Sequence, residues 1–197
     1  MDGAVFDDLR ARLAHVRPAE RIAIGWSLGA QVAIERARVQ RDIDRLVLIA
    51  ATPCFVQRED WAHGVDAGTF RGFVSSLARD IDGTLDRFVS LQARGDTNAK
   101  HVMRALRQAK SCDDVGRLED GLRDLLRTDL RPTLAGLACP ALVIHGEHDT
   151  LVPRAAAEYL AHELPQAKLE IIGGGAHAPF VSHPERVASA VADFIDG

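Results

Sequence analysis

The segment Gly25-Trp26-Ser27-Leu28-Gly29 decides the fold of this chain. It directly follows a short apolar run at 22–24 and directly precedes a helix-like stretch at 30–38. A serine between two glycines at this spacing, on a sharp turn from strand to helix, forms a nucleophile elbow whose Oγ projects free of the sheet. Strand and helix nearly touch at such a turn, so we expect that a Cβ would clash at both Gly25 and Gly29.

The composition is that of a soluble globular domain. The chain has 197 residues, 47% of them hydrophobic and 26% charged, which is enough for one domain with an insertion. A net charge of -4 argues against nucleic-acid binding. No apolar run approaches the ~20 residues that span a bilayer, so no membrane partner is expected.

The N-terminal sequence, the cysteines and the histidines favour a cytoplasmic protein without a cofactor. The first residues, 1–4, have neither a basic segment nor a long apolar core, so we expect no signal peptide. The three cysteines are far apart and suit a reduced cytosol. The eight histidines show no metal-ligand spacing, so no metal site is expected.

Apolar runs that alternate with helical patterns predict a parallel α/β sheet. Continuous apolar runs at 45–50, 141–145 and 169–172 are typical of strands buried on both faces, and 22–24 makes a fourth. Helical spacing appears at 6–16, 154–164 and 184–195. The last of these helices is preceded by Ser182-x-x-Glu185, which predicts a capping box. Strands that alternate with helices imply right-handed crossovers in one parallel sheet.

The segment between the second and third strands lacks strand character. Apolar residues recur at helical spacing in four groups, around Phe70, Leu85, Val102 and Leu122. Four helices inserted after a parallel strand predict a cap over the carboxyl edge of the sheet, where open α/β sheets bind ligands. We therefore divide the chain into a first core part (1–58), a helical cap (59–134) and a second core part (135–197).

Two further loops carry the residue types that a serine nucleophile needs. The strand at 141–145 leads into a loop that contains Asp149, and the strand at 169–172 leads into a loop that contains His177. The imidazole of His177 can remove the proton of Ser27, and Asp149 can orient the imidazole. The chain order serine, aspartate, histidine is that of an α/β sheet hydrolase rather than of other serine-enzyme folds.

Other histidines compete for the role of base. His148 lies next to Asp149, His145 lies within a strand, and His183 stands at a helix start, so His177 is the better candidate. Ser182 lies near His177 in sequence but has no elbow, so capping is its better interpretation.

Together these motifs resemble the α/β-hydrolase family. Three segments are similar more narrowly to the pimeloyl-[acyl-carrier protein] methyl ester esterases of biotin synthesis. They are the elbow 25–29, the stretch 176–184, Ala-His-Ala-Pro-Phe-Val-Ser-His-Pro, and the cap run 87–92, Arg-Phe-Val-Ser-Leu-Gln. This resemblance continues through 95–107, 129–131 and 149–154 and spans nearly the whole chain.

The resemblance implies a carboxylesterase that releases methanol from a pimeloyl methyl ester carried by an acyl carrier protein. It implies that Leu28 offers its backbone N–H to the oxyanion. It also implies that the substrate is bound by Ser27, Leu28, Phe88, Val89, Ser90, Leu91, Gln92 and His177.

Positive charge in the cap is the feature that suits an acidic carrier. Residues 85–110 hold six Lys and Arg against two Asp, in a chain of net charge -4. Lys100, Arg104 and Arg107 follow one helical face, and Arg87 precedes them. A solvated surface is the default interpretation; the alternative is a docking surface for the carrier that includes Arg87, Lys100 and Arg104.

One departure from the family pattern lies before the elbow. α/β-Hydrolases normally place several strands there, and the loop after the third supplies a second oxyanion N–H. Nothing of that kind precedes Ser27, so we expect the first half of the sheet to be absent and turnover to be reduced. The strand at 22–24 would then expose an apolar edge, and a monomer is expected if this edge is covered.

Three functions therefore stay open. The first is the carrier-dependent methyl esterase, the second a generic esterase or lactonase with the same three residues, and the third a non-catalytic fragment that binds the carrier.

Overall fold

The computed structural model describes residues 20–77, 79–109 and 115–197. These residues form a four-stranded, wholly parallel sheet in the order β1-β2-β3-β4. The strands are β1 (Ile22–Trp26), β2 (Arg45–Ile49), β3 (Ala141–Gly146) and β4 (Ala167–Ile172). The parallel α/β sheet is confirmed, and each strand lies where an apolar run predicts one. The helix expected at 6–16 lies outside the described residues.

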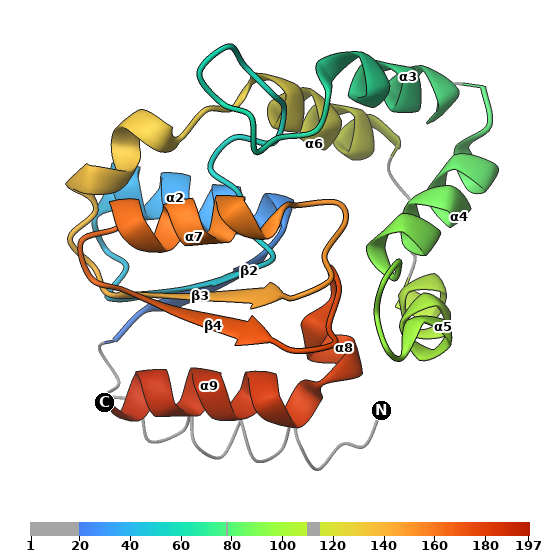
Figure 1. Ribbon diagram of the computed structural model, residues 1–197. Helices are drawn as coiled ribbons and strands as arrows, with labels where there is room; N and C mark the ends of the chain where they lie inside the picture. The colour runs from blue at the N-terminus through green and yellow to red at the C-terminus, as the bar shows by residue number, and fades with distance from the viewer. Residues whose placement is uncertain (1–19, 78, 110–114) are drawn as a thin grey trace.

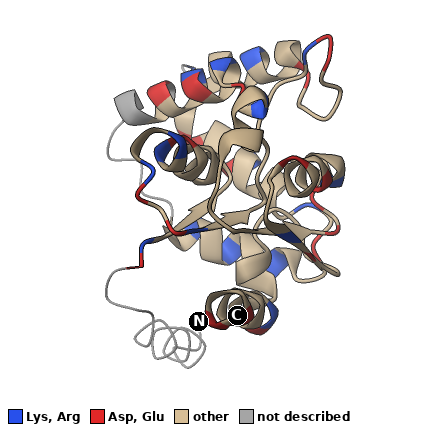
Figure 2. Ribbon diagram, turned by 90° about the vertical axis from the view of Figure 1, so that its left-hand side faces the viewer, with Lys and Arg blue, Asp and Glu red and all other residues tan. Residues whose placement is uncertain are grey.

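Helices cover both faces of the sheet. In Figure 1, α2 (Leu28–Gln40) and α7 (Arg154–Glu163) lie above the strands, and α9 (Pro184–Asp196) lies below them. Figure 2 gives the same layers from the side, with the helix that ends at the C-terminus beneath the sheet. The continuous apolar runs follow from this arrangement, because a strand between two helical layers is buried on both faces.

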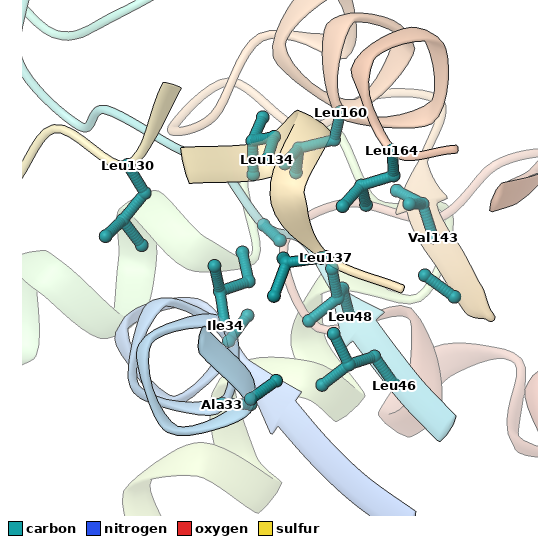
Figure 3. Packing of buried hydrophobic residues seen from close by; sticks show 14 of the residues in the cluster. Ala33, Ile34, Leu46, Leu48, Leu130, Leu134, Leu137, Val143, Leu160 and Leu164 are labelled. Carbon is teal, nitrogen blue, oxygen red and sulfur yellow. The ribbon is translucent and has the colours of Figure 1, made fainter. Parts of the chain in front are cut away.

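The core on the α2 and α7 side is built from aliphatic side chains. Figure 3 shows Ile34 of α2 and Leu160 of α7 pointing toward Leu48 and Val143 of the strands, and all four are fully buried. Leu134 joins them from the short 3-10 helix η1 (Arg131–Gly136). A second cluster on the opposite face packs α9 against β2 and β3 through residues such as Val191 and Ile144. The two clusters fix where the strands end, and therefore where the loops after them lie.

Four helices lie between β2 and β3 in the described residues. They are α3 (Ala67–Leu77), α4 (Ile81–Gln92), α5 (Ala99–Ala109) and α6 (Val115–Arg127), and each contains one of the predicted helical groups. Figure 1 shows α4 and α5 beyond the carboxyl ends of the strands, with α3 and α6 above them. We call α3–α6 the cap helices. The domain boundaries near 58 and 134 stay predictions.

The capping box expected at Ser182 is wrong. His183 is the residue that precedes α9, and the helix start has no side-chain cap. Ser182 instead ends a short helix, α8 (Pro179–Ser182), that the sequence analysis does not predict. Its hydroxyl donates to Asp96 Oδ2 at 2.8 Å, so the hydroxyl is engaged by a buried carboxylate and not by the helix start.

β1 stands at one edge of the sheet, where an exposed apolar residue was expected. Ile24 is 49% exposed, which is unusual for a strand residue of its size. On the other face of the sheet, α2 also exposes two apolar side chains, Val32 and Val39, both 61% exposed.

Candidate active site

The nucleophile elbow has the expected backbone strain. Ser27 connects β1 to α2 with φ 54° and ψ -118°, a conformation that costs energy for a residue with a Cβ. Its own N–H donates to Ile49 O at 2.9 Å, which ties the turn to β2. A Cβ on Gly25 would lie 2.4 Å from Gly29 O, so glycine is required there.

The expectation that a Cβ would clash is wrong for Gly29. Apart from its chain neighbours and the backbone of its own helix, a Cβ built on this residue would meet no atom of the described structure within 4 Å. The close approach at the elbow is one-sided, because Gly25 faces the start of α2 whereas Gly29 faces outward from it. Only the first glycine of the motif is therefore fixed by sterics in this structure.

The structure brings Ser27, His177 and Asp149 into one hydrogen-bonded chain. The Ser27 hydroxyl donates to His177 Nε2 at 3.0 Å, and His177 Nδ1–H donates to Asp149 Oδ2 at 2.7 Å. The side chains of His177 and Asp149 are fully buried. This geometry lets the imidazole accept a proton from Ser27 while the carboxylate fixes its orientation.

Asp149 is held in its ionised form by several donors. Its second oxygen, Oδ1, accepts hydrogen bonds from the backbone N–H groups of Leu151 at 2.8 Å and Val152 at 3.0 Å. Burial alone would raise the pKa of the Asp149 carboxyl. The charge that His177 can carry and its hydrogen bond outweigh burial, so the pKa lies below its ordinary value. A carboxylate that stays ionised can stabilise an imidazolium.

His177 is fixed from its backbone as well as from its ring. Trp26, the residue before the nucleophile, donates its indole N–H to His177 O at 2.8 Å. The two rings are 5.7 Å apart, and Phe180 packs edge-on against the other side of the indole. Sequence analysis does not assign Trp26 this role, although its place inside the elbow motif is a signal.

The competing histidines contact other groups. His148 Nδ1 donates to Gly95 O at 3.0 Å, and His183 contacts the Ser182 hydroxyl at 2.8 Å. His145 is fully buried and donates from Nε2 to Val152 O at 3.0 Å. His177 is therefore the histidine that hydrogen-bonds Ser27 in the described structure.

His145 is a close neighbour of Asp149. Its Nε2 is 3.8 Å from Asp149 Oδ2, while its Nδ1 is buried without a hydrogen-bond partner in the described structure. Burial lowers the pKa of His145, and this effect outweighs the nearby Asp149 charge. His145 is accordingly a neutral buried group.

A pocket of about 300 Å³ opens beside Ser27. Its wall is mostly apolar, and its polar side chains are those of Ser27 and of Gln92 on α4. The lining residues are Trp26, Ser27, Leu28, Phe88, Gln92, Leu118, Gly121, Leu122 and Leu125. An apolar pocket with a few polar groups suits a ligand with an aliphatic stem.

The predicted substrate-binding run 88–92 splits between two faces of α4. Phe88 and Gln92, one turn apart, line the pocket. Val89 is buried elsewhere, Ser90 is exposed and donates to Asp86 O, and Leu91 is 38% exposed. The structure therefore does not bring Val89, Ser90 and Leu91 to the pocket. The leucines of α6 at 118, 122 and 125 complete its wall instead, and their helical spacing is the signal that could have identified them.

The predicted docking residues lie on the outside of α4 and α5. Arg87, Lys100 and Arg104 are exposed. Arg87 donates to Thr84 Oγ1 at 2.8 Å, and Arg104 contacts His101 Nδ1 at 3.2 Å. Arg107 lies 3.8 Å from Asp86, which joins the two helices. Arg87 also lies 3.9 Å from Asp80, so the basic face of the cap helices consists mainly of Lys100 and Arg104 on α5.

A larger hollow of about 610 Å³ lies along α2 and is lined by Val32, Glu35 and Val39, among others, but not by Ser27. Neither a cluster of three potential metal ligands nor a helix long and apolar enough to span a bilayer occurs within residues 20–77, 79–109 and 115–197.

The chain matches a known family over nearly its whole length. The model of a family described as "Alpha/beta hydrolase family" matches residues 2–190. The chain belongs to the alpha/beta hydrolase family. The family resemblance read from the motifs is thereby confirmed.

Within this family, curated relatives with one name are similar over most of the chain. A pimeloyl-[acyl-carrier protein] methyl ester esterase of Xanthomonas campestris pv. campestris is 43% identical over 188 residues, which are 94% of this chain and 74% of the relative. A protein of the same name from Aromatoleum aromaticum is 42% identical over 91% of this chain and 76% of its own length. This hydrolase thus spans about three quarters of the length of both relatives.

Solved structures share the fold at lower identity. An esterase from Exiguobacterium antarcticum has a TM-score of 0.80 at 18% identity and covers 88% of this chain and 66% of its own. A bromoperoxidase from Bacillus anthracis has a TM-score of 0.79 at 23% identity, over 98% of this chain and 72% of its own. These two likenesses establish the hydrolase fold.

Proposed function

We propose that this protein is a serine carboxylesterase that hydrolyses the methyl ester of a pimeloyl chain attached to an acyl carrier protein, in biotin synthesis. The observation that carries the proposal is the hydrogen-bonded chain Ser27–His177–Asp149, whose Ser27 lines an apolar pocket. The names of the curated relatives support the substrate. A cytoplasmic location belongs to the same proposal.

In the proposed reaction, Ser27 Oγ attacks the ester carbonyl as His177 Nε2 accepts its proton. Asp149 stabilises the imidazolium without taking the proton. The bond from the former carbonyl carbon to the methoxy oxygen then breaks, the imidazolium gives its proton to that oxygen, and methanol leaves while the acyl group stays esterified to Ser27 Oγ. Water, deprotonated by His177, attacks this ester and releases the ω-carboxylate.

The oxyanion needs donors near the attacked carbonyl. Leu28 is the first residue of α2, and the first N–H groups of a helix have no partner inside it. We assign the Leu28 N–H to the oxyanion because it directly follows the nucleophile and lies at the positive end of the α2 dipole.

The pocket accounts for the apolar stem of the substrate. Phe88, Leu122 and Leu125 offer aliphatic and aromatic contacts to methylene groups, and Gln92 offers a polar group. Because the pocket is apolar, a substrate with charge along its stem would lose hydration without compensation.

The basic face of the cap helices supports a carrier-bound substrate. Lys100 and Arg104 share one exposed face of α5, and Arg87 is exposed on α4. Acidic partners are steered toward such a face at low ionic strength.

The direct test is methanol release from carrier-bound pimeloyl methyl ester. The purified protein is expected to turn it over, and Ser27→Ala to abolish turnover. Ser189→Ala removes an exposed hydroxyl on α9 and serves as the control that keeps full rate. Equal turnover in the Ser27→Ala variant would refute the proposal.

Comparing the turnover of different substrates distinguishes the other candidate functions. A generic esterase or lactonase would turn over p-nitrophenyl butyrate or a simple lactone faster than the carrier-bound ester. A non-catalytic carrier-binding protein would turn over none of them yet still bind the carrier.

Carrier docking is tested by charge reversal. The double variant Lys100→Glu, Arg104→Glu is expected to slow carrier association by ~10-fold or more at low salt, and by much less at high salt. Lys168→Glu reverses an exposed charge at the start of β4, at the end of the strands away from the cap helices, and serves as the control. Docking through α5 is excluded if the double variant associates like the control.

A further inference from the structure

The segment that joins α4 to α5 contacts the loop that carries His177. We call residues 93–98 the connector and residues 173–178 the histidine loop. The backbone N–H of Thr97 donates to Gly174 O at 2.9 Å, and its hydroxyl contacts the same oxygen at 3.2 Å. Just before the connector, Gln92 O accepts the backbone N–H of His177 at 3.2 Å. The cap helices are therefore bonded to the backbone of the base itself.

The connector also contacts the loop that carries the acid. His148, the neighbour of Asp149, donates its ring N–H to Gly95 O at 3.0 Å. Gly95 has φ 89°, and a Cβ on it would lie 2.9 Å from His148 O. Any other residue at 95 would be strained and would push the connector away from the acid loop.

Asp96 is the centre of the connector. It is only 7% exposed, which is rare for an aspartate. Its Oδ2 accepts the backbone N–H of Ala176 at 2.9 Å and the hydroxyl of Ser182 at 2.8 Å, while its Oδ1 accepts the N–H of Asn98 at 2.7 Å. Three donors compensate the burial of its charge.

Ala176 and Ser182 flank His177 in the chain. One carboxylate oxygen thus binds the stretch at 176–182 at both of its ends, and the base lies between these two points. On the same side of the molecule, α5 packs against α8 through residues such as Val102 and Val181.

We propose that Asp96 is a positioning residue that holds His177 at hydrogen-bond distance from both Ser27 and Asp149. The inference rests on the proposed function of that site. Asp96 touches none of the reacting atoms; it acts through the backbone of Ala176 and the Ser182 hydroxyl. In this arrangement the cap helices determine the geometry of the base as well as the wall of the pocket.

The kinetic test compares Asp96→Ala, Asp96→Asn and Ser182→Ala on p-nitrophenyl butyrate. We expect Asp96→Ala to lower kcat by about 10²-fold with little change in KM, because misplacing a reactive group by ~1 Å has an effect of that size. Asp96→Asn keeps one oxygen acceptor for Ala176 and Ser182 and should recover most of the loss. Ser182→Ala removes one of the two flanking bonds and should give a smaller loss. Asp120→Ala, an exposed acid on α6, is the matched control.

An NMR measurement tests the positioning role of Asp96 without depending on turnover. The proton between His177 Nδ1 and Asp149 is expected as a downfield NMR resonance that shifts or broadens in Asp96→Ala and stays unchanged in Asp120→Ala. If Asp96→Ala does not fold, Asp96→Asn and Ser182→Ala give the same comparison. Unchanged kcat together with an unchanged resonance in the Asp96 variants would overturn the inference. An unsubstituted protein without esterase activity would instead count against the proposed function, and the resonance would still test Asp96.

Discussion

The sheet side and the cap side of the site are built in different ways. On the sheet side, Ser27, Asp149 and His177 follow three strands of the sheet, and the backbone N–H of Ser27 is bonded to Ile49 O of β2. On the cap side, each helix buries one face only; α5, for example, buries Val102 alone among its residues. The difference indicates that the reacting groups are built on the sheet edge, while most of the pocket wall is built on helices that have fewer buried residues.

The largest expected effect is on kcat and comes from a substitution on the sheet side of the site. Asp149→Asn keeps the size of the side chain but no longer favours the Nδ1–H tautomer of His177, so kcat should fall by about 10⁴-fold. Leu118→Ala, on the cap side of the same pocket, should mainly raise KM. Initial rates on p-nitrophenyl butyrate measure both parameters. Similar kcat losses in the two variants would contradict this difference between the sheet side and the cap side of the site.

A second prediction compares stability on the two sides. Leu48 is fully buried between helices and strands, so Leu48→Ala should lower the free energy of unfolding by about 2–5 kcal/mol. Leu122 is 7% exposed and borders the pocket, so Leu122→Ala should have a smaller effect, because part of its surroundings is already open. Urea unfolding followed by circular dichroism measures both. An equal or larger loss in Leu122→Ala would show that the cap helices are as tightly packed as the sheet.

The third prediction concerns pH and is smaller. His145 is buried with its pKa lowered, so the unfolded chain binds this proton more readily than the folded protein. Stability is then complete above the unfolded pKa of about 6.5 and decreases as pH falls, by up to ~1.4 kcal/mol for each pH unit until the folded pKa is reached. The groups that face His145 are Asp149, His177 and Arg154.

His145→Phe isolates this contribution. The variant leaves Val152 O without its donor and should be less stable at pH 7.5, but its stability should change less between pH 7.5 and 5.5. Urea unfolding at the two pH values gives the slope for each protein. A slope as steep as that of the unsubstituted protein would assign the pH dependence to other groups.

Much of the sheet side was predictable from the sequence, because local patterns determine it. Continuous apolar runs mark the parallel strands, and chemistry-bearing residues directly after them must meet at one edge of the sheet. Chain order then selects Ser27, Asp149 and His177. Gly29 is the exception, because the direction in which its Cβ would point depends on how α2 leaves the turn.

The cap side was predictable only as a set of helices. Helical spacing identifies α4 but does not say which of its faces meets the pocket, so Phe88 and Gln92 could not be separated from Val89, Ser90 and Leu91. Asp96 looks like an ordinary loop acid between two helices. Its burial and its contacts with Ala176 and Ser182 depend on residues about 80 positions further along the chain.

The most direct test of the central claim is covalent labelling of the nucleophile. A fluorophosphonate reacts with a serine only when a base activates it, so mass spectrometry of the digested protein should find one adduct, on the peptide that contains Ser27. Labelling should be lost in His177→Ala, because Ser27 then has no proton acceptor. An adduct elsewhere, or equal labelling of Ser27 in His177→Ala, would contradict a Ser27–His177–Asp149 active site.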